Sequence, residues 1–181
     1  MPKFRSKPKK GDAHSRAGSF EDLDISQRAA ELSKHKLSLE LAIAREIKEP
    51  DERALALCKL ASHHLSMGSD PSPLLVEALL SADSVEDDLK KGVVLVEIAC
   101  FFKSSGNDPL PLLSQAVSHI ARSPHCGLVK DALFIRIGSI CMELRNYDAA
   151  LDAIARVSDS AAKAVVLTMV QAERAKAFSL D

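Results

Sequence analysis

The sequence predicts an all-α protein in which pairs of helices repeat along the chain. A short phrase centred on an alanine occurs four times, at Ala44, Ala82, Ala121 and Ala155, with 38, 39 and 34 residues between successive alanines. Seven or eight residues after each copy, a basic residue opens an apolar run: Arg53, Lys91, Lys130 and Lys163. Self-similarity at a period of about 20 to 50 residues is typical of stacked repeat proteins. Apolar residues recur at three- and four-residue steps, and no segment requires a strand.

Size and composition predict one domain with an aliphatic core. The chain has 181 residues, of which 46% are apolar, with one tyrosine, six phenylalanines and no tryptophan. A chain of this length buries a substantial core. The charge is uneven, because residues 1–18 carry six cations against Asp12, which places +5 on this segment and −6 on the remainder.

Residues 1–23 are expected to form a disordered basic tail, and residues 24–181 the helical-repeat domain. The tail combines prolines, glycines and clustered lysines with few apolar side chains, so burial cannot offset its ordering entropy. Its arm Lys3–Lys10 would serve as a solubilising or targeting tail, or would contact nucleic acid in a salt-dependent way. Phe4 is the one aromatic residue in this arm, so base stacking is not expected.

Helices are predicted near residues 25–48, 51–67, 71–82, 86–104, 109–122, 127–144, 147–157 and 159–177. The first ends before Pro50, since the residue before a proline disfavours helix. Gly68 is the predicted left-handed cap that ends the second helix. Asp70 caps the third, with Pro71 in its first turn.

The turn sequence of the first helix pair is repeated in the second pair. Gly106–Leu113 matches Gly68–Leu75 at six of eight positions, after a shift of 38 residues. The third pair has Arg145–Asp148 in place of the glycine turn and is shorter. The helix near residues 86–104 is apolar nearly all round, which predicts a buried position in the middle of the stack. Its initial run Glu86–Asp88 complements the helix dipole.

The third pair resembles a tetratricopeptide repeat. The residues at the family's spacings are Phe134, Ile137, Gly138, Cys141, Ala150 and Ile154, and Asn146–Asp148 is similar to its inter-helix turn. Gly138 and Ala150 are small enough for two helices to cross closely. The earlier pairs match more loosely. The resemblance covers roughly residues 39–177 and implies a right-handed α-α superhelix, an α-solenoid of about three and a half helix pairs.

The resemblance also implies a function, which is to bind proteins or peptides in a concave groove lined by the first helix of each pair. The expected protein is a non-enzymatic adaptor or chaperone-like module that binds an apolar or amphipathic segment of a partner. The groove residues that follow by position are Leu55, Cys58, Ser62, Val93, Val96, Cys100, Lys103, Ala132, Ile135, Ser139 and Met142. For each of them the alternative is burial against a neighbouring unit. The Lys and Asn residues with which chaperone-type members hold a terminal carboxylate do not occur at these places.

No catalytic, metal or cofactor residues are predicted. Metal-type ligands gather only at His63–His64 and at His119, His125 and Cys126. Adjacent histidines on a helix point in different directions, and a zinc site needs four convergent ligands. The sequence holds no glycine-rich phosphate loop and no Ser/His/Asp arrangement, so an enzyme is not expected. Glu97 and Arg136 occupy equivalent places in adjacent pairs and would either form an ion pair or reach solvent.

The remaining expectations concern cellular location and self-association. Cys58, Cys100, Cys126 and Cys141 form no CxxC pair, and no secretory signal or membrane span is visible, so a reduced cytoplasmic protein is expected. The C-terminal helix would mediate homo-oligomers through an apolar surface formed by Leu167, Met169, Val170 and Phe178. Ala121 is predicted to lie at a close helix crossing, where leucine would overpack.

Overall fold

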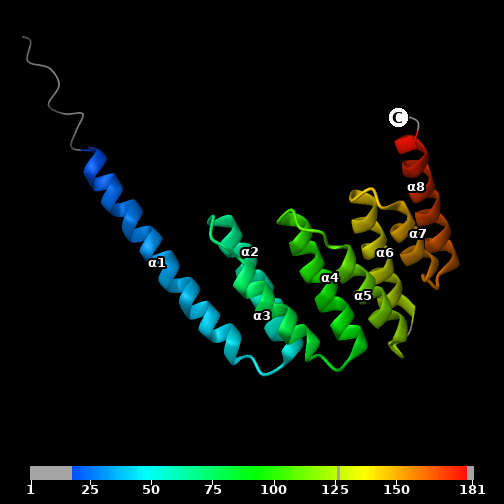
Figure 1. The fold of residues 1–181 in the computed structure, drawn as a ribbon, viewed down its shortest axis with the longest axis horizontal. Helices are drawn as coiled ribbons and strands as arrows, with labels where there is room; N and C mark the ends of the chain where they lie inside the picture. The colour runs from blue at the N-terminus through cyan, green and yellow to red at the C-terminus, as the bar shows by residue number, and fades with distance from the viewer. Residues whose placement is uncertain (1–17, 126, 179–181) are drawn as a thin grey trace, which may run out of the picture. The chain divides into compact units, whose positions relative to one another are not determined.

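The computed structural model describes residues 18–125 and 127–178, and its regular elements there are all α-helices (Figure 1). Their bounds are α1 (Gly18–Glu46), α2 (Pro50–Ser66), α3 (Ser72–Asp83), α4 (Asp88–Ser104), α5 (Leu110–Arg122), α6 (Gly127–Glu143), α7 (Tyr147–Ala155) and α8 (Ser160–Phe178). The all-α prediction is confirmed. Every predicted helix boundary lies within two residues of the observed one, except the start of α1.

The chain divides into two compact units. The first unit is Met1–Glu40 and the second is Leu41–Asp181. Helix α1 begins at Gly18, so residues 18–23 are helical and the prediction of disorder up to residue 23 was wrong for them. Acidic residues in this stretch favour a helix start, because they complement the dipole there. The basic arm lies in residues 1–17, outside the described residues.

In the second unit, helices that follow one another in sequence pack against one another. The most extensive contacts join α2 to α3, α4 to α5 and α6 to α7, which are therefore helix hairpins. The first helices of successive hairpins also touch, α2 with α4 and α4 with α6, and α6 touches α8. Figure 1 shows these elements in chain order from α2 to α8. This is the order of neighbours that the sequence repeat predicts.

The core of the second unit is aliphatic, as the composition predicts. Apart from Cys141, its largest fully buried side chains are Leu57, Leu95, Ile98, Leu113, Ile120, Ile137, Ile154, Val94, Val96 and Val170. Helix α4 is buried on most of its circumference, which confirms its predicted central position. Burial of this kind is the main favourable term in folding.

Two glycines allow the helices of a hairpin to cross closely. A Cβ atom on Gly138 of α6 would lie 2.6 Å from Ile154 Cδ1 of α7, which confirms the predicted crossing. A Cβ atom on Gly92 of α4 would lie 2.4 Å from Ile120 Cγ1 of α5. Ala121 is exposed, so its predicted place at a close crossing was wrong. Its neighbour Ile120 occupies that place because it points into the hairpin.

The three hairpin turns share one backbone conformation. Gly68, Gly106 and Arg145 have positive φ angles of 71°, 78° and 57°. The predicted left-handed cap at Gly68 is therefore confirmed. In the first two hairpins the carboxylates of Asp70 and Asp108 each accept a hydrogen bond from the backbone N–H two residues later. These bonds hold the chain as it enters α3 and α5.

The basic residues that follow each copy of the alanine phrase have a common structural role. Each lies in the first turn of its helix and donates a hydrogen bond to a carbonyl oxygen near the end of the preceding helix. The bonds run from Arg53 to Ile47, from Lys91 to Asp83, from Lys130 to Ala121 and Ser123, and from Lys163 to Ala155. The last carbonyls of a helix have no intrahelical donor, and a cation there also complements the dipole.

Candidate binding cleft

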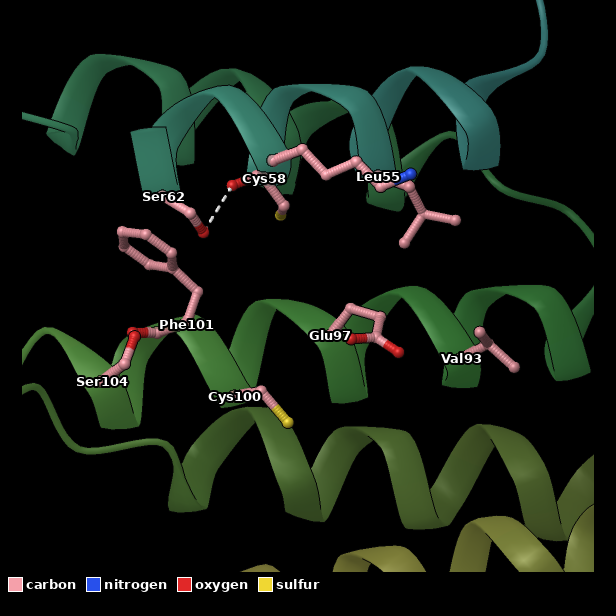
Figure 2. Close-up of a pocket in the computed structure, with 9 residues that line it drawn as sticks. Leu55, Cys58, Ser62, Val93, Glu97, Cys100, Phe101 and Ser104 are labelled. Carbon is pink, nitrogen blue, oxygen red and sulfur yellow. Dashed lines mark hydrogen bonds between the residues drawn. The ribbon is translucent and has the colours of Figure 1, made fainter. Parts of the chain in front are cut away.

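A cleft of about 520 Å³ lies between α2 and α4, within the second unit (Figure 2). Its lining residues come from these two helices: Leu55, Cys58, Lys59, Ser62, Val93, Glu97, Cys100, Phe101 and Ser104. Figure 2 shows Leu55 and Ser62 on one wall, across from Val93 and Phe101 on the other. On each wall the lining positions recur at three- and four-residue steps. The cleft therefore has two helical walls that are mostly uncharged.

Five of the eleven predicted groove residues line this cleft: Leu55, Cys58, Ser62, Val93 and Cys100. Val96 does not, because its side chain is 0% exposed and belongs to the core. Its prediction as a contact residue was wrong. A helix buried on most sides turns some of its apolar positions inwards, and apolar spacing alone does not show which ones.

The other predicted groove residues lie elsewhere along the same row of helices. Lys103 of α4 pairs with Glu143 of α6. Ala132 is exposed, and three further residues of α6 are half-buried outside this cleft: Ile135, Ser139 and Met142. The cleft therefore occupies one junction between hairpins, and the predicted groove was longer. Sequence reasoning missed four lining residues: Lys59, Glu97, Phe101 and Ser104.

The two charged residues of the cleft share one repeat position, which Arg136 occupies on α6 outside the lining. Lys59 on α2, Glu97 on α4 and Arg136 on α6 follow at shifts of 38 and 39 residues. Both carboxylate oxygens of Glu97 accept hydrogen bonds from Arg136, at 2.6 Å from Nη1 and 3.0 Å from Nη2. Of the two alternatives for Glu97 and Arg136, the structure shows the ion pair between neighbouring hairpins. The planar guanidinium presents two parallel N–H donors that match both carboxylate oxygens, whereas an ammonium group acts as a point charge.

Lys59 is left without an acidic partner. It is exposed, and within the part of the chain that the structure describes no hydrogen bond or ion pair joins it to another residue. The acid at its own repeat position, Glu97, is held by Arg136 on the other side of α4. The cleft thus contains one neutralised carboxylate and one cation whose charge is not compensated.

The nucleophile-type side chains of the cleft are occupied or neutral. Burial raises the pKa of the Cys58 thiol to about 12, and the charge of Glu97 acts in the same direction. Cys58 is therefore protonated at neutral pH, and a protonated thiol is a weak nucleophile. The Ser62 hydroxyl donates to the Cys58 carbonyl oxygen at 3.1 Å. Cys100 points away from α2 in Figure 2, and its Sγ accepts from Arg136 Nη2 at 3.7 Å.

Two of the histidines singled out in the sequence, His119 and His125, lie beside carboxylates at the start of α4. His119 Nδ1 lies 2.6 Å from Asp88 Oδ1, and His125 Nε2 lies 3.5 Å from Asp87 Oδ2. Asp87 also accepts a hydrogen bond from the backbone N–H of Lys90, so it is the N-cap of α4. Among residues 18–125 and 127–178, no three His, Cys, Asp or Glu side chains are grouped to hold a metal ion. Cys126 lies outside these ranges.

Helix α8 carries part of the apolar surface that the sequence suggests for self-association. Met169 is 55% exposed and Val165, which was not predicted, is 62% exposed. Val170 was predicted to belong to this surface but is fully buried. Leu167 is half-buried, and the Phe178 side chain lies outside the described residues. None of the helices in the described part of the chain has the length and apolar character needed to cross a membrane.

Comparison with known proteins places the fold but not a family. No protein-family model matches the chain, and no curated protein matches it. The chain is similar in structure to Ton1535 from Thermococcus onnurineus NA1. The TM-score is 0.63 at 19% sequence identity, and the match covers 82% of this chain. The chain spans 46% of the length of that protein, and at this identity the likeness concerns the fold alone.

Proposed function

We propose that this protein is a non-enzymatic adaptor that binds an apolar or amphipathic segment of a partner protein in the cleft between α2 and α4. The observation that carries the proposal is the cleft itself. Apolar side chains from both helices, among them Leu55 and Val93, are half-buried there and available to a ligand. Removing such side chains from water is the usual driving force for association.

The chemistry of the lining favours binding over catalysis. General acid–base catalysis needs a titratable group free to exchange a proton with a substrate. Glu97 is held at both oxygens by Arg136, and the Cys58 thiol is protonated. The Ser62 hydroxyl is directed to a backbone oxygen of its own helix. These side chains suit the wall of a binding site.

The same proposal includes a tetratricopeptide-like superhelix for α2–α8. The contacts between successive hairpins and the glycine crossing in the third hairpin support it. In such a stack the first helices of the hairpins line one face, and α2, α4 and α6 touch in that order. Neighbouring clefts along that face would then extend the binding surface beyond α2 and α4.

The test compares partner capture by the wild type and by a Leu55→Glu, Val93→Glu double variant. A matched control carries Val76→Glu and Leu80→Glu on α3, where both side chains are more than half exposed outside the cleft. We expect a bound protein that is lost only with the cleft variant, while thermal melts show that both variants fold. Equal retention by the two variants would contradict the proposal.

A further inference from the structure

We infer that the occupant of the cleft is an amphipathic helix about three turns long that places an acidic side chain against Lys59. This inference rests on the proposed function and specifies the partner's chemistry. Three observations carry it: the helical walls, the length of the cleft and the uncompensated charge of Lys59.

The walls favour a helix over a strand. A strand binds by adding to a sheet edge, which offers free backbone N–H and C=O groups. Both walls here are helices, whose internal backbone groups are already bonded. The lining positions rise along each wall at helical spacing, Leu55, Cys58 and Ser62 on α2, and Val93, Glu97 and Cys100 on α4. Such ridges accept the ridges of a third helix.

The length of the walls limits the size of the segment. The lining runs from Leu55 to Ser62 on α2 and from Val93 to Ser104 on α4. At the helical rise these spans correspond to roughly 10 and 16 Å. A helix of about 12 residues, with apolar residues at positions i, i+4 and i+7, would cover both walls.

The charges favour an acidic segment over a basic one. Glu97 would attract a basic ligand, but Arg136 holds both of its oxygens. Lys59 keeps its charge beside the apolar lining and has no acidic partner among the described residues. A docked helix would partly remove Lys59 from water, and an acid on that helix would offset the loss. The repeat explains why Lys59 has no acidic partner, since Glu97, the acid at the same repeat position, pairs with Arg136 of α6 and not with α2.

The test uses labelled synthetic helical peptides of about 12 residues, with one leucine-based apolar face in common. Their flanking residues are Glu, Gln or Lys, and a fourth peptide carries Glu and a central proline that prevents the helix. Fluorescence anisotropy at low salt measures binding to the full chain. We expect the Glu peptide to bind about fivefold more tightly than the Lys peptide, and the proline peptide to bind least.

Two variants locate the preference. Lys59→Glu, at an exposed position, should reverse the order of the Glu and Lys peptides. Lys48→Glu, at an exposed position of the second unit that does not line the cleft, should leave the order unchanged. Arg136→Gln should release Glu97 towards Lys59 and reduce the preference for the Glu peptide. A preference that persists in Lys59→Glu would overturn the inference.

The remaining outcomes separate this inference from the proposed function. If all helical peptides bind equally, the acidic selection is wrong and the apolar cleft stands. If the proline peptide binds as well as the Glu peptide, the helical occupant is wrong. If no peptide binds, both this inference and the proposed function fail. The occupant left to test would then be a second copy of the chain, which would form a concentration-dependent dimer that Leu55→Glu abolishes.

Discussion

The first two hairpins of the second unit differ from the third in their turns and in what lies between them. The α2–α3 and α4–α5 turns use glycine, and an aspartate and a proline precede α3 and α5. The α6–α7 turn uses Arg145, and Asn146 caps α7 by accepting a hydrogen bond from the Ala149 N–H at 3.0 Å. Helices α3 and α5 have 12 and 13 residues, whereas α7 has 9.

The same division appears along the row of first helices. Between the first two hairpins, α2 and α4 leave a cleft lined mainly by uncharged side chains. Between the second and the third, Glu97 and Lys103 of α4 pair with Arg136 and Glu143 of α6. One repeat position carries opposite charges on α4 and α6 and a lone cation on α2. An ion pair also joins α2 to α4, because Lys90 Nζ lies 3.0 Å from Asp51 Oδ2, but both residues lie in the first turns of their helices and outside the lining of the cleft. The difference between the two junctions is that the same repeat position forms an ion pair between α4 and α6 and borders a mostly uncharged cleft between α2 and α4.

The largest effect on stability should come from the close crossing of α4 and α5, because α4 takes part in both the α2–α4 and the α4–α6 junctions. Gly92→Leu would place side-chain atoms where Ile120 already lies, and overpacking at such a site costs about 3 kcal/mol. Chemical denaturation measures the free energy of unfolding. The matched control, Ala132→Leu at an exposed site of α6, should change it by less than about 0.5 kcal/mol. Equal effects at the two sites would show that α4 and α5 are not in close contact.

The next largest effect on stability should come from a buried carboxylate of the third hairpin that the first two hairpins lack. The buried carboxylate of Asp131 accepts hydrogen bonds from the N–H and hydroxyl of Ser158 and from the Asp159 N–H, and so holds the loop before α8. Asp131→Ala should lower the free energy of unfolding by about 2 kcal/mol. The equivalent positions in the earlier hairpins are Ala54 and Gly92, so they have no counterpart to lose.

This contribution should depend on pH. Burial opposes ionisation of Asp131, but the bonds from Ser158 and Asp159 outweigh it and lower its pKa below the ordinary value. A carboxylate with a lowered pKa in the folded state stabilises the protein above the unfolded pKa, and this stabilisation is lost as the pH falls through the folded pKa. The difference between the wild type and Asp131→Ala should therefore narrow below about pH 4. A difference that grows on acidification would contradict this assignment.

A smaller effect should follow from exchanging the turn residues of the second and third hairpins. Gly106 and Arg145 both have left-handed φ angles. This conformation is less favourable by about 1 kcal/mol for a residue that carries a Cβ atom than for glycine. Gly106→Arg should lower the free energy of unfolding by about that amount, and Arg145→Gly should raise it by about 0.5 to 1 kcal/mol. Opposite signs in thermal melts of the two variants would confirm that the turns share one backbone. Equal signs would show that Arg145 has contacts that justify its strain.

The smallest effect on stability should come from the ion pair between Glu97 of α4 and Arg136 of α6. The side chains of Glu97 and Arg136 are 36% and 44% exposed, so solvent screens their attraction. A double-mutant cycle with Glu97→Gln and Arg136→Gln should give a coupling of at most about 1 kcal/mol, which decreases with added salt. A coupling independent of salt would mean that the pair is more buried than the structure shows.

Much of the helical architecture could be predicted from residues close together in the sequence. The bounds of α2–α8, the left-handed turn at Gly68 and the small residue at the α6–α7 crossing follow from caps, turn residues and apolar spacing. These signals act over a few residues, so a single sequence carries them. Five residues of the cleft were also among the positions that the resemblance to tetratricopeptide repeats implied.

The rest depends on how each helix is rotated and on which neighbour it meets. Val93 lines the cleft while Val96, less than one helical turn away, is fully buried. Glu97 could pair on either side of α4, and the geometry of its carboxylate and the Arg136 guanidinium selects α6. No pattern in the sequence predicted that Asp131 accepts a hydrogen bond from Ser158, 27 residues away. Local and periodic signals in the sequence are enough to define the helices, their turns and their order. Which apolar side chains face the cleft, and which charges are paired, depends on contacts between distant segments and therefore follows only from the packed helices.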